Sequence, residues 1–328
     1  MTPTPQQIRS ETYKLDRAAD ALADLDHAPL SESVVTIRAV SKSLNKLANN
    51  LTDTTPYKLK LGYVANASEV KLVKQIGATY ARVQGWPGGA NDITDAFDHG
   101  LEVSIRIARE YIPNTTSRAL DPLTTDAMRN TMIGKIAADI AVYKAHGVKQ
   151  IILGNEPDGK RNSQPRYWTG AIDRFGTDWA RHIAPLVRSA GIRVGFGLPI
   201  FATLTAKFAA DLVSSGAYKS GDFFAANVYG ANAQDHHNRK SNHIAALMGV
   251  STFNPVTDFE ISEAGLQRGG PADAWLAEMK TTIDIYRSTK FPGAVSIYRI
   301  DENGEAPFAP FKDGKPTATF DEWKALAA

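Results

Sequence analysis

The sequence predicts a (β/α)8 barrel, the TIM barrel, preceded by an N-terminal α-helical hairpin. From about residue 57 onward, eight short apolar runs rich in β-branched residues alternate with stretches of helical periodicity. Strands that alternate with helices imply a parallel sheet with helical crossovers. Eight such units fill residues 56–328, which matches the size of a closed barrel.

Apolar runs of strand length define the eight barrel strands. We expect them at residues 59–64, 80–84, 101–108, 150–153, 192–198, 223–228, 256–261 and 294–300. We expect helices at residues 66–76, 92–97, 125–146, 177–190, 204–214, 244–248, 272–288 and 320–327. The rival is an open doubly wound sheet, which usually carries a Gly-rich phosphate loop after its first strand. Asn66-Ala67-Ser68 is no such loop, so the barrel is favoured.

Residues 1–55 form a separate region, the helical hairpin extension, ahead of the barrel at 56–328. Thr4 and Gln7 fit a capping box, with Pro5 at the first helical position. Apolar residues then recur at helical spacing on both sides of Pro29, which predicts two amphipathic helices. Their apolar face either packs on the barrel or mediates docking or self-association, since amphipathicity says only that something covers it.

Composition excludes several classes of function. The chain has 328 residues, of which 43% are hydrophobic and 22% charged, as in a soluble globular protein. Its net charge of +2 gives no electrostatic footprint for nucleic acid or an anionic membrane. With no cysteine, disulfides, thiolate metal sites and a cysteine nucleophile are excluded. The first residues lack the apolar core of a signal peptide, and no apolar run reaches the ~20 residues of a membrane span.

The carboxyl ends of barrel strands carry the function in folds of this kind. The fourth strand ends in Asn155-Glu156-Pro157, and the seventh ends in Glu263-Ala264-Gly265. Their two carboxylates therefore face each other across the mouth of the barrel. Glycoside hydrolysis needs such a pair, because one carboxyl protonates the leaving oxygen while the other attacks or activates water.

Asn155-Glu156-Pro157 and Glu263-x-Gly265 resemble the two signatures of the retaining glycoside hydrolases of clan A. Arg82 on the second strand and Tyr229 on the sixth match further positions of that clan. The resemblance covers residues 57–328 and not the hairpin. It implies a retaining β-glycosidase with Glu156 as acid/base and Glu263 as nucleophile.

The same resemblance gives supporting roles to three residues. Asn155 would hydrogen-bond the sugar 2-hydroxyl, a contact that strengthens in the transition state. Arg82 and Tyr229 would favour the ionised form of Glu263. Glu260 competes with Glu263 for the role of nucleophile. Strand alternation places the two on opposite faces, and the position of Glu263 at the strand end favours it.

Four further residues are candidates for substrate binding. Trp86 follows the second strand and would stack on a sugar face, with ordinary packing as the equal alternative. Asn227 shares a strand face with Tyr229. Tyr298 takes the place where the clan often has a tryptophan beneath the sugar. His236 lies in a polar segment expected to form a loop at the cleft rim.

Other functions are weighed against the glycosidase. Asp235, His236, His237 and His243 suggest a metal, but ligand spacing alone is weak evidence, so no metal is expected. Residues 264–265 and 301–304 do not form the glycine-rich loops of a phosphate-binding barrel, and no cofactor is expected. A non-catalytic carbohydrate-binding barrel in a larger assembly would have lost a carboxylate, and both are present. Loops of moderate length suggest an open cleft for an oligo- or polysaccharide, and this substrate class favours an extracellular or periplasmic location.

Overall fold

The structure is a computed structural model. It describes residues 8, 11–12, 14–15, 18–19, 34–41, 44, 57–85, 88–89, 93, 100–107, 126–156, 160–161, 164–165, 180–219, 221–250, 253–255, 258–266, 272–302 and 309–328. The chain divides into two compact units, Met1–Lys58 and Leu59–Ala328.

The first unit contains helical residues on both sides of Pro29. Residues 34–41 are helical, and so are the described residues between 8 and 19. Thr12 and Ser41 are both buried, and the Ser41 hydroxyl donates to the Thr12 carbonyl at 3.5 Å. The two helical stretches therefore lie side by side within this unit. The remaining residues of the hairpin, including the capping box at Thr4, lie outside the described residues.

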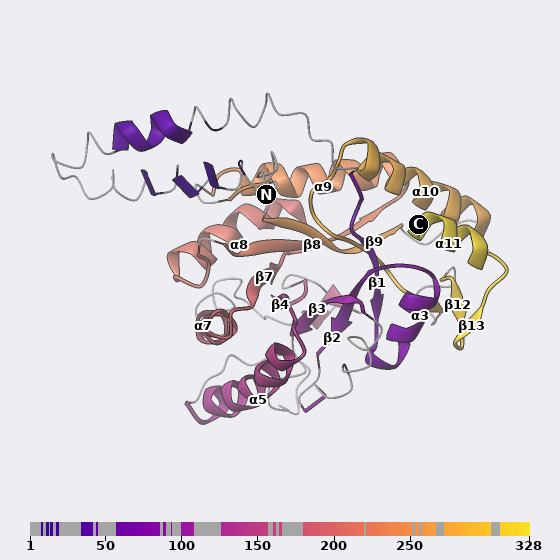
Figure 1. The fold of residues 1–328 in the computed structure, drawn as a ribbon, viewed down its shortest axis with the longest axis horizontal. Helices are drawn as coiled ribbons and strands as arrows, with labels where there is room; N and C mark the ends of the chain where they lie inside the picture. Colours follow the sequence, from indigo (N-terminus) through magenta and orange to yellow (C-terminus); the bar gives the residue numbers. More distant parts are fainter. Residues whose placement is uncertain are drawn as a thin grey trace. The chain divides into compact units, whose positions relative to one another are not determined.

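Eight parallel strands close into a barrel in the second unit (Figure 1). They are β1 (Leu61–Ala65), β2 (Tyr80–Gln84), β3 (Glu102–Ile107), β4 (Gln150–Leu153), β7 (Arg193–Gly197), β8 (Phe223–Gly230), β9 (Phe259–Leu266) and β10 (Val295–Ile297). β1 pairs with β10, so the sheet has no open edge. The prediction of a closed TIM barrel is therefore confirmed, and the doubly wound alternative is wrong.

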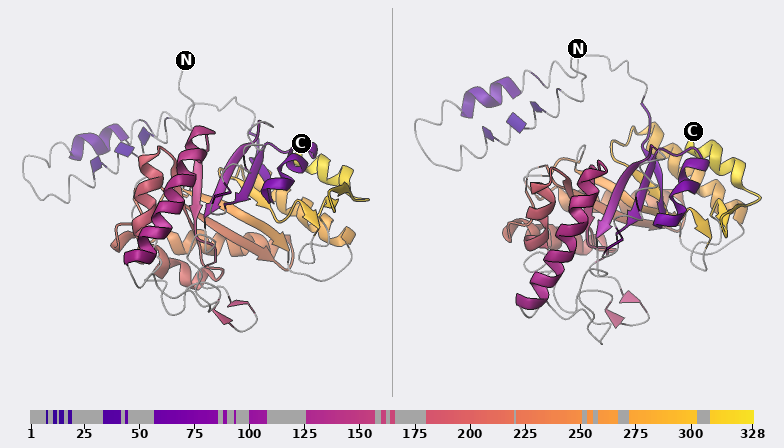
Figure 2. Two further views of the ribbon diagram at one scale, coloured as in Figure 1. Left: turned by 90° about the horizontal axis from the view of Figure 1, so that it is seen from below. Right: turned by 60° about the horizontal axis from the view of Figure 1, so that its bottom comes forward.

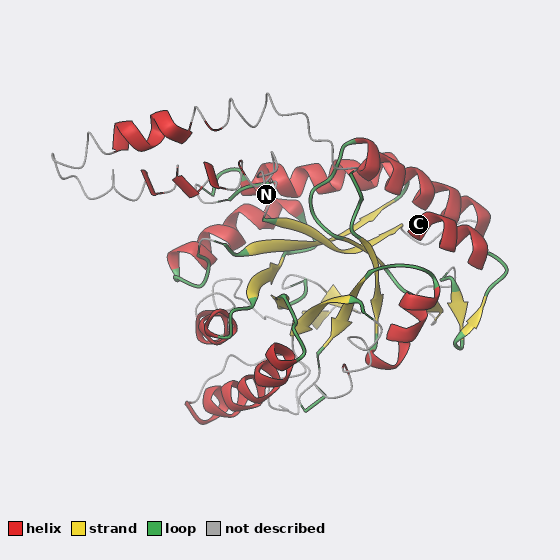
Figure 3. Cartoon of the chain, viewed as in Figure 1, coloured by secondary structure: helices red, strands yellow, loops and turns green. Residues whose placement is uncertain are grey.

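Helices lie around the barrel strands in the two further views of Figure 2 and in the colouring by secondary structure of Figure 3. They are η1 (Ala67–Glu69), α3 (Val70–Gln75), α5 (Asp126–Ala145), α7 (Arg181–Ser189), α8 (Ala202–Ser214), α9 (Ala233–Leu247), α10 (Ala272–Ser288) and α11 (Phe320–Ala327). Short strand pairings lie outside the barrel: β5 (Lys160–Arg161) with β6 (Gln164–Pro165), and β11 (Asp301–Glu302), β12 (Phe311–Lys312) and β13 (Lys315–Pro316) in one sheet. Across the described part of the chain, no helix combines the length and apolar character that a bilayer span requires.

Helix α9 differs most from the sequence prediction, which placed a polar loop before a short helix at 244–248. The helix begins at Ala233, and the Asn232 side chain caps it by accepting a hydrogen bond from the Asp235 amide at 2.9 Å. Its buried face consists largely of His236, Lys240 and His243. These polar side chains recur at helical spacing, but they are not apolar, so a search for apolar periodicity misses them.

The strand β9 contains a β-bulge that changes which side chains face the barrel interior. Ile261 pairs with Ala226 and Glu263 pairs with Asn227, so Ser262 is the extra residue. Glu260 and Glu263 therefore both point inward, and the prediction that they lie on opposite faces is wrong. Glu260 accepts hydrogen bonds from Gln150 at 2.7 Å and Tyr80 at 3.5 Å, at the amino ends of β4 and β2. Burial raises the pKa of Glu260.

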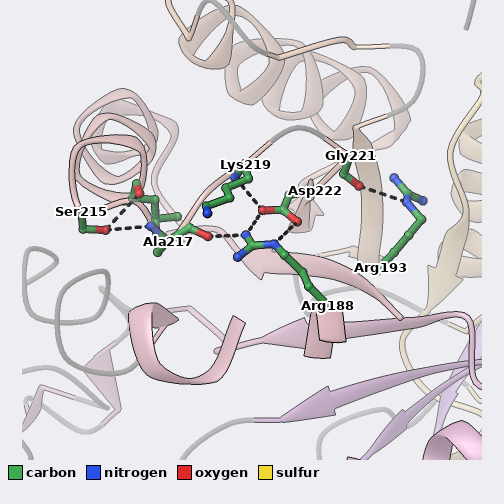
Figure 4. Close-up of polar contacts among 8 residues, drawn as sticks. Arg188, Arg193, Ser215, Ala217, Lys219, Gly221 and Asp222 are labelled. Carbon is green, nitrogen blue, oxygen red and sulfur yellow. Dashed lines mark hydrogen bonds and ion pairs between the residues drawn. The ribbon is translucent and has the colours of Figure 1, made fainter. Parts of the chain in front are cut away.

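A partly buried ion pair lies at the amino end of β8 (Figure 4). Arg188 on α7 pairs with both oxygens of Asp222, which lies immediately before β8. The Lys219 amide also donates to Asp222 at 2.7 Å, and Arg188 donates to the Ala217 carbonyl. Burial raises the pKa of Asp222, and the hydrogen bond from Arg188 opposes that shift. These contacts stabilise the end of the barrel opposite the strand ends that carry the candidate site.

The buried histidines of α9 predict that acid destabilises the fold. Burial lowers the pKa of His243 to about 4, and burial and the charge of Lys240 lower the pKa of His236 to about 3. Because an unfolded histidine titrates near ~6.5, the unfolded chain binds protons first as the pH falls. The contribution of each buried neutral histidine to the free energy of unfolding is therefore fully present above pH ~6.5. It decreases by about 2 kcal/mol when the pH falls to 5.

Urea unfolding at pH 7 and pH 5 measures this effect. His243→Asn retains a side chain that can bond Thr205, which lies 2.9 Å from the imidazole Nδ1, and it removes the titration. We expect its free energy of unfolding to change less between the two pH values than that of the wild type. Equal changes in the two proteins would contradict the assignment. The raised pKa values of Glu260 and Asp222 act in the opposite sense and are common to both proteins.

Candidate active site

Glu156 lies in the turn that follows β4, at the carboxyl end of the barrel. Its φ is 44°, in the left-handed region, and Gly154 also has a positive φ of 79°. A residue with a side chain is uncommon in this region, and such strained positions concentrate at functional sites. The Asn227 amide donates to the Glu156 carboxyl at 2.9 Å and holds this side chain. Glu156 is 5% exposed.

Glu263 lies inside the barrel on β9, where two donors hold its carboxylate. Arg82 Nη1 lies 2.8 Å from Glu263 Oε1, and the Tyr229 hydroxyl donates to Oε2. Arg82 is 2% exposed and Glu263 is 6% exposed. A buried ion pair persists only where further hydrogen bonds satisfy its remaining atoms, and Tyr229 supplies one of them.

A network of amides joins the two carboxylates. Asn155 Oδ1 accepts from Arg82 Nη2 at 3.3 Å and from Asn227 Nδ2 at 3.0 Å. Ser262 donates to Asn227 Oδ1 at 2.8 Å, which fixes the orientation of the Asn227 amide. The contacts run without interruption from Glu263 through Arg82, Asn155 and Asn227 to Glu156. Side chains from β2, β8, β9 and the end of β4 thereby form one site.

The charges of both carboxylates affect the pKa of Tyr229. Burial raises the pKa of its hydroxyl well above the ordinary value, and the negative charges of Glu263 and then Glu156 raise it further. The hydroxyl therefore remains a hydrogen-bond donor across the physiological pH range. The Tyr298 ring packs edge-on against Tyr229, with ring centroids 6.0 Å apart. Tyr298 is thus part of the same site.

Gly265 provides the space that Tyr229 occupies. A Cβ atom at position 265 would lie 2.7 Å from both Cδ1 and Cε1 of the Tyr229 ring, closer than real side-chain contacts allow. Glycine at this position lets the ring lie beside β9 with its hydroxyl on Glu263. This contact is a physical reason for the glycine two residues after the glutamate.

Gly265→Ala is expected to displace the Tyr229 ring and remove its hydroxyl from Glu263. Overpacking of this kind costs about 1–3 kcal/mol of stability. A double-mutant cycle with Tyr229→Ala tests the cause, measured as free energy of unfolding by urea. We expect Gly265→Ala to be destabilising in the wild type and nearly neutral when Tyr229 is already alanine. An equal cost in both backgrounds would show that the methyl group meets something other than the ring.

Most of the residues proposed from the sequence come together here. The site contains Arg82, Asn155, Glu156, Asn227, Tyr229, Glu263 and Tyr298. Trp86 lies outside the described residues. Ser262 also belongs to the network, but the sequence analysis missed it. No residue pattern predicts the bulge that turns Ser262 toward Asn227.

His236 does not lie at the rim of a cleft, so that expectation is corrected. It is fully buried on α9, and its Nδ1 lies 3.2 Å from the Tyr286 hydroxyl of α10. The reason is that its segment is helical, which turns position 236 toward the neighbouring helix. Within the described ranges, no group of three or more His, Cys, Asp and Glu side chains is placed to hold a metal ion.

The sequence matches no family model and no curated protein, whereas solved structures match the fold. A family 128 (subgroup II) endo-β-1,3-glucanase from Sorangium cellulosum has a TM-score of 0.55 and 11% identity, over 81% of this chain and 98% of its own. A psychrophilic family 10 endo-β-1,4-xylanase has a TM-score of 0.56 and 11% identity, over 81% and 96%. A family 5 protein from Streptomyces cattleya, in complex with GlcNAc, has a TM-score of 0.60 and 14% identity, over 83% and 80%.

These three structural neighbours are clan A glycoside hydrolases. At such low identity the likeness concerns the fold alone. The chain therefore shares the eight-stranded parallel barrel of clan A glycoside hydrolases, the clan whose fourth- and seventh-strand signatures its sequence resembles.

Proposed function

We propose that this protein is a retaining β-glycoside hydrolase that acts on an oligo- or polysaccharide by double displacement. One observation carries the proposal. Two buried glutamates at the carboxyl end of a closed barrel belong to one hydrogen-bonded network, with an arginine on Glu263 and an amide on Glu156. A carboxyl pair of this kind is the machinery of glycoside hydrolysis.

The first step assigns different roles to the two carboxyl groups. Glu263 attacks the anomeric carbon, and the bond from that carbon to the glycosidic oxygen breaks. Glu156 gives its proton to the glycosidic oxygen as this bond breaks. The products are a glycosyl ester on Glu263 and a free leaving-group hydroxyl. Glu263 suits the nucleophile because its ion pair with Arg82 requires the carboxylate form.

The second step reverses these proton movements. The Glu156 carboxylate takes a proton from water as the water oxygen attacks the anomeric carbon. The ester bond breaks, Glu263 leaves as a carboxylate, and two inversions give net retention. Arg82 and Tyr229 stabilise the carboxylate again as it leaves.

Asn155, Asn227, Tyr298 and Trp86 are assigned to substrate binding in this proposal. Asn155 Oδ1 is occupied by Arg82 and Asn227, which leaves Nδ2 as the group that donates to the sugar 2-hydroxyl. The Tyr298 ring, held against Tyr229, would contact the sugar in the same subsite. An extracellular or periplasmic location suits a polysaccharide substrate.

The test is hydrolysis of cellopentaose, laminaripentaose and xylopentaose, with the first-formed product anomer followed by proton NMR. We expect turnover of at least one pentasaccharide and a β anomer as the first product. The Glu156→Gln/Glu263→Gln double variant, purified in parallel, controls for contaminating enzymes. An α anomer would contradict retention. Binding without turnover would favour the non-catalytic carbohydrate-binding barrel instead.

A further inference from the structure

Phe201 is an aromatic side chain that faces solvent at the end of the barrel where the candidate site lies. It is 61% exposed, and among the described Phe, Tyr and Trp residues it alone is classed as exposed. It follows β7 and is the residue that immediately precedes α8. Since a helix that follows a barrel strand begins at the carboxyl end of that strand, Phe201 lies on the same face as Glu156 and Glu263.

The end of β7 packs directly on the turn that carries Glu156. A Cβ atom at Gly197 would lie 2.6 Å from the Gly154 carbonyl oxygen, so only glycine permits this approach. Phe201 follows Gly197 by four residues, and a chain of that length reaches at most about 14 Å. Because β7 neighbours β4 in the barrel, Phe201 lies on the side of the barrel next to the strand that leads into Glu156.

The loop that presents Phe201 is held at both ends. The Leu198 amide donates to the Ala225 carbonyl of β8 at 2.9 Å. On the other side, the buried His243 of α9 bonds the Ile200 backbone and lies 2.9 Å from the Thr205 hydroxyl of α8. An exposed aromatic ring on an anchored loop loses little conformational freedom when a ligand covers it, which favours binding.

We infer that Phe201 is an aromatic platform for a sugar ring on the leaving-group side of the scissile bond. A pyranose ring presents a face of C–H groups that packs on an aromatic ring, and Glu156, as the acid, stands beside the leaving oxygen. This assignment rests on the proposed glycosidase function. It requires a substrate whose leaving group is itself a sugar, as in an oligo- or polysaccharide.

The test compares two substrates that share the same glycone. One is the pentasaccharide that the wild type hydrolyses, and the other is the matching biosyl fluoride, whose leaving group is too small to reach Phe201. We expect Phe201→Ala to lower kcat/KM for the pentasaccharide by about tenfold and to leave that for the fluoride nearly unchanged. Phe201→Trp should retain activity on both, and Phe201→Leu should resemble Phe201→Ala.

Met248→Ala is the matched control. Met248 is 58% exposed at the C-terminus of α9, which places it at the opposite end of the barrel. If Phe201→Ala behaves like Met248→Ala on the pentasaccharide, or slows both substrates alike, the platform is overturned while the glycosidase remains. If the wild type hydrolyses neither substrate, the proposed function fails and the platform fails with it.

Discussion

Glu263→Ala is expected to abolish hydrolysis, with a loss on the order of 10⁴-fold or more in kcat. The reason is that no carboxylate remains to attack the anomeric carbon and form the glycosyl ester. Sodium azide should restore turnover, since the small anion occupies the space of the lost carboxylate. Azide then attacks from the face that Glu263 used while Glu156 still protonates the leaving group. The product should be the α-glycosyl azide, identified by NMR.

Glu260→Gln is the matched control for this prediction. Glu260 is a buried glutamate on the same strand that also points into the barrel, but its partners are Gln150 and Tyr80 at the other end. Burial raises the pKa of Glu260 because it disfavours the charged form, so we expect the neutral glutamine to be tolerated at this buried position. We expect activity within roughly threefold of wild type. Loss of activity in Glu260→Gln with retention in Glu263→Ala would overturn the assignment.

Glu156→Gln is expected to slow hydrolysis of oligosaccharides by about 10²–10⁴-fold, the usual contribution of a general acid. Glycosyl fluorides should form the glycosyl ester at nearly the wild-type rate, because fluoride leaves without a proton. Pre-steady-state bursts of fluoride release measure this step. Glutamine retains the shape of the side chain, so the left-handed backbone at Glu156 is equally strained in both proteins.

Two outcomes separate the acid from a purely structural residue. With Glu156→Ala and a glycosyl fluoride, azide should attack the ester on Glu263 and give the β-glycosyl azide, opposite in configuration to the product from Glu263→Ala. Equal slowing of fluorides and oligosaccharides would remove Glu156 from the role of acid. It would then act only in holding the network with Asn227.

The fold was predictable from the sequence because parallel barrel strands are buried on both faces. Such strands read as continuous apolar runs, and each of the eight expected runs overlaps an observed strand. The two catalytic candidates were also predictable, since each follows or ends such a run next to a recognisable motif. Arg82 and Tyr229 were proposed because they match positions of the clan that the sequence resembles, and both contact Glu263 in the structure.

Two features were not predictable for physical reasons. The bulge at Ser262 depends on how β9 pairs with β8, which is a property of two strands and not of a local pattern. The helix α9 buries His236, Lys240 and His243, so its inward face resembles a solvated loop in composition. Because of this polar composition, the sequence analysis expected His236 in a loop at the cleft rim. In the structure its imidazole lies against Tyr286.

Peptide mapping of a trapped intermediate tests whether Glu263 is the nucleophile. The wild type is incubated with the 2-deoxy-2-fluoroglycosyl fluoride of the sugar identified in the pentasaccharide assay, then digested and analysed by mass spectrometry. We expect one added glycosyl group on the peptide that contains Glu263, located on that residue by fragmentation. A label on Glu260 or on another residue, or turnover with inversion and no label, would contradict it.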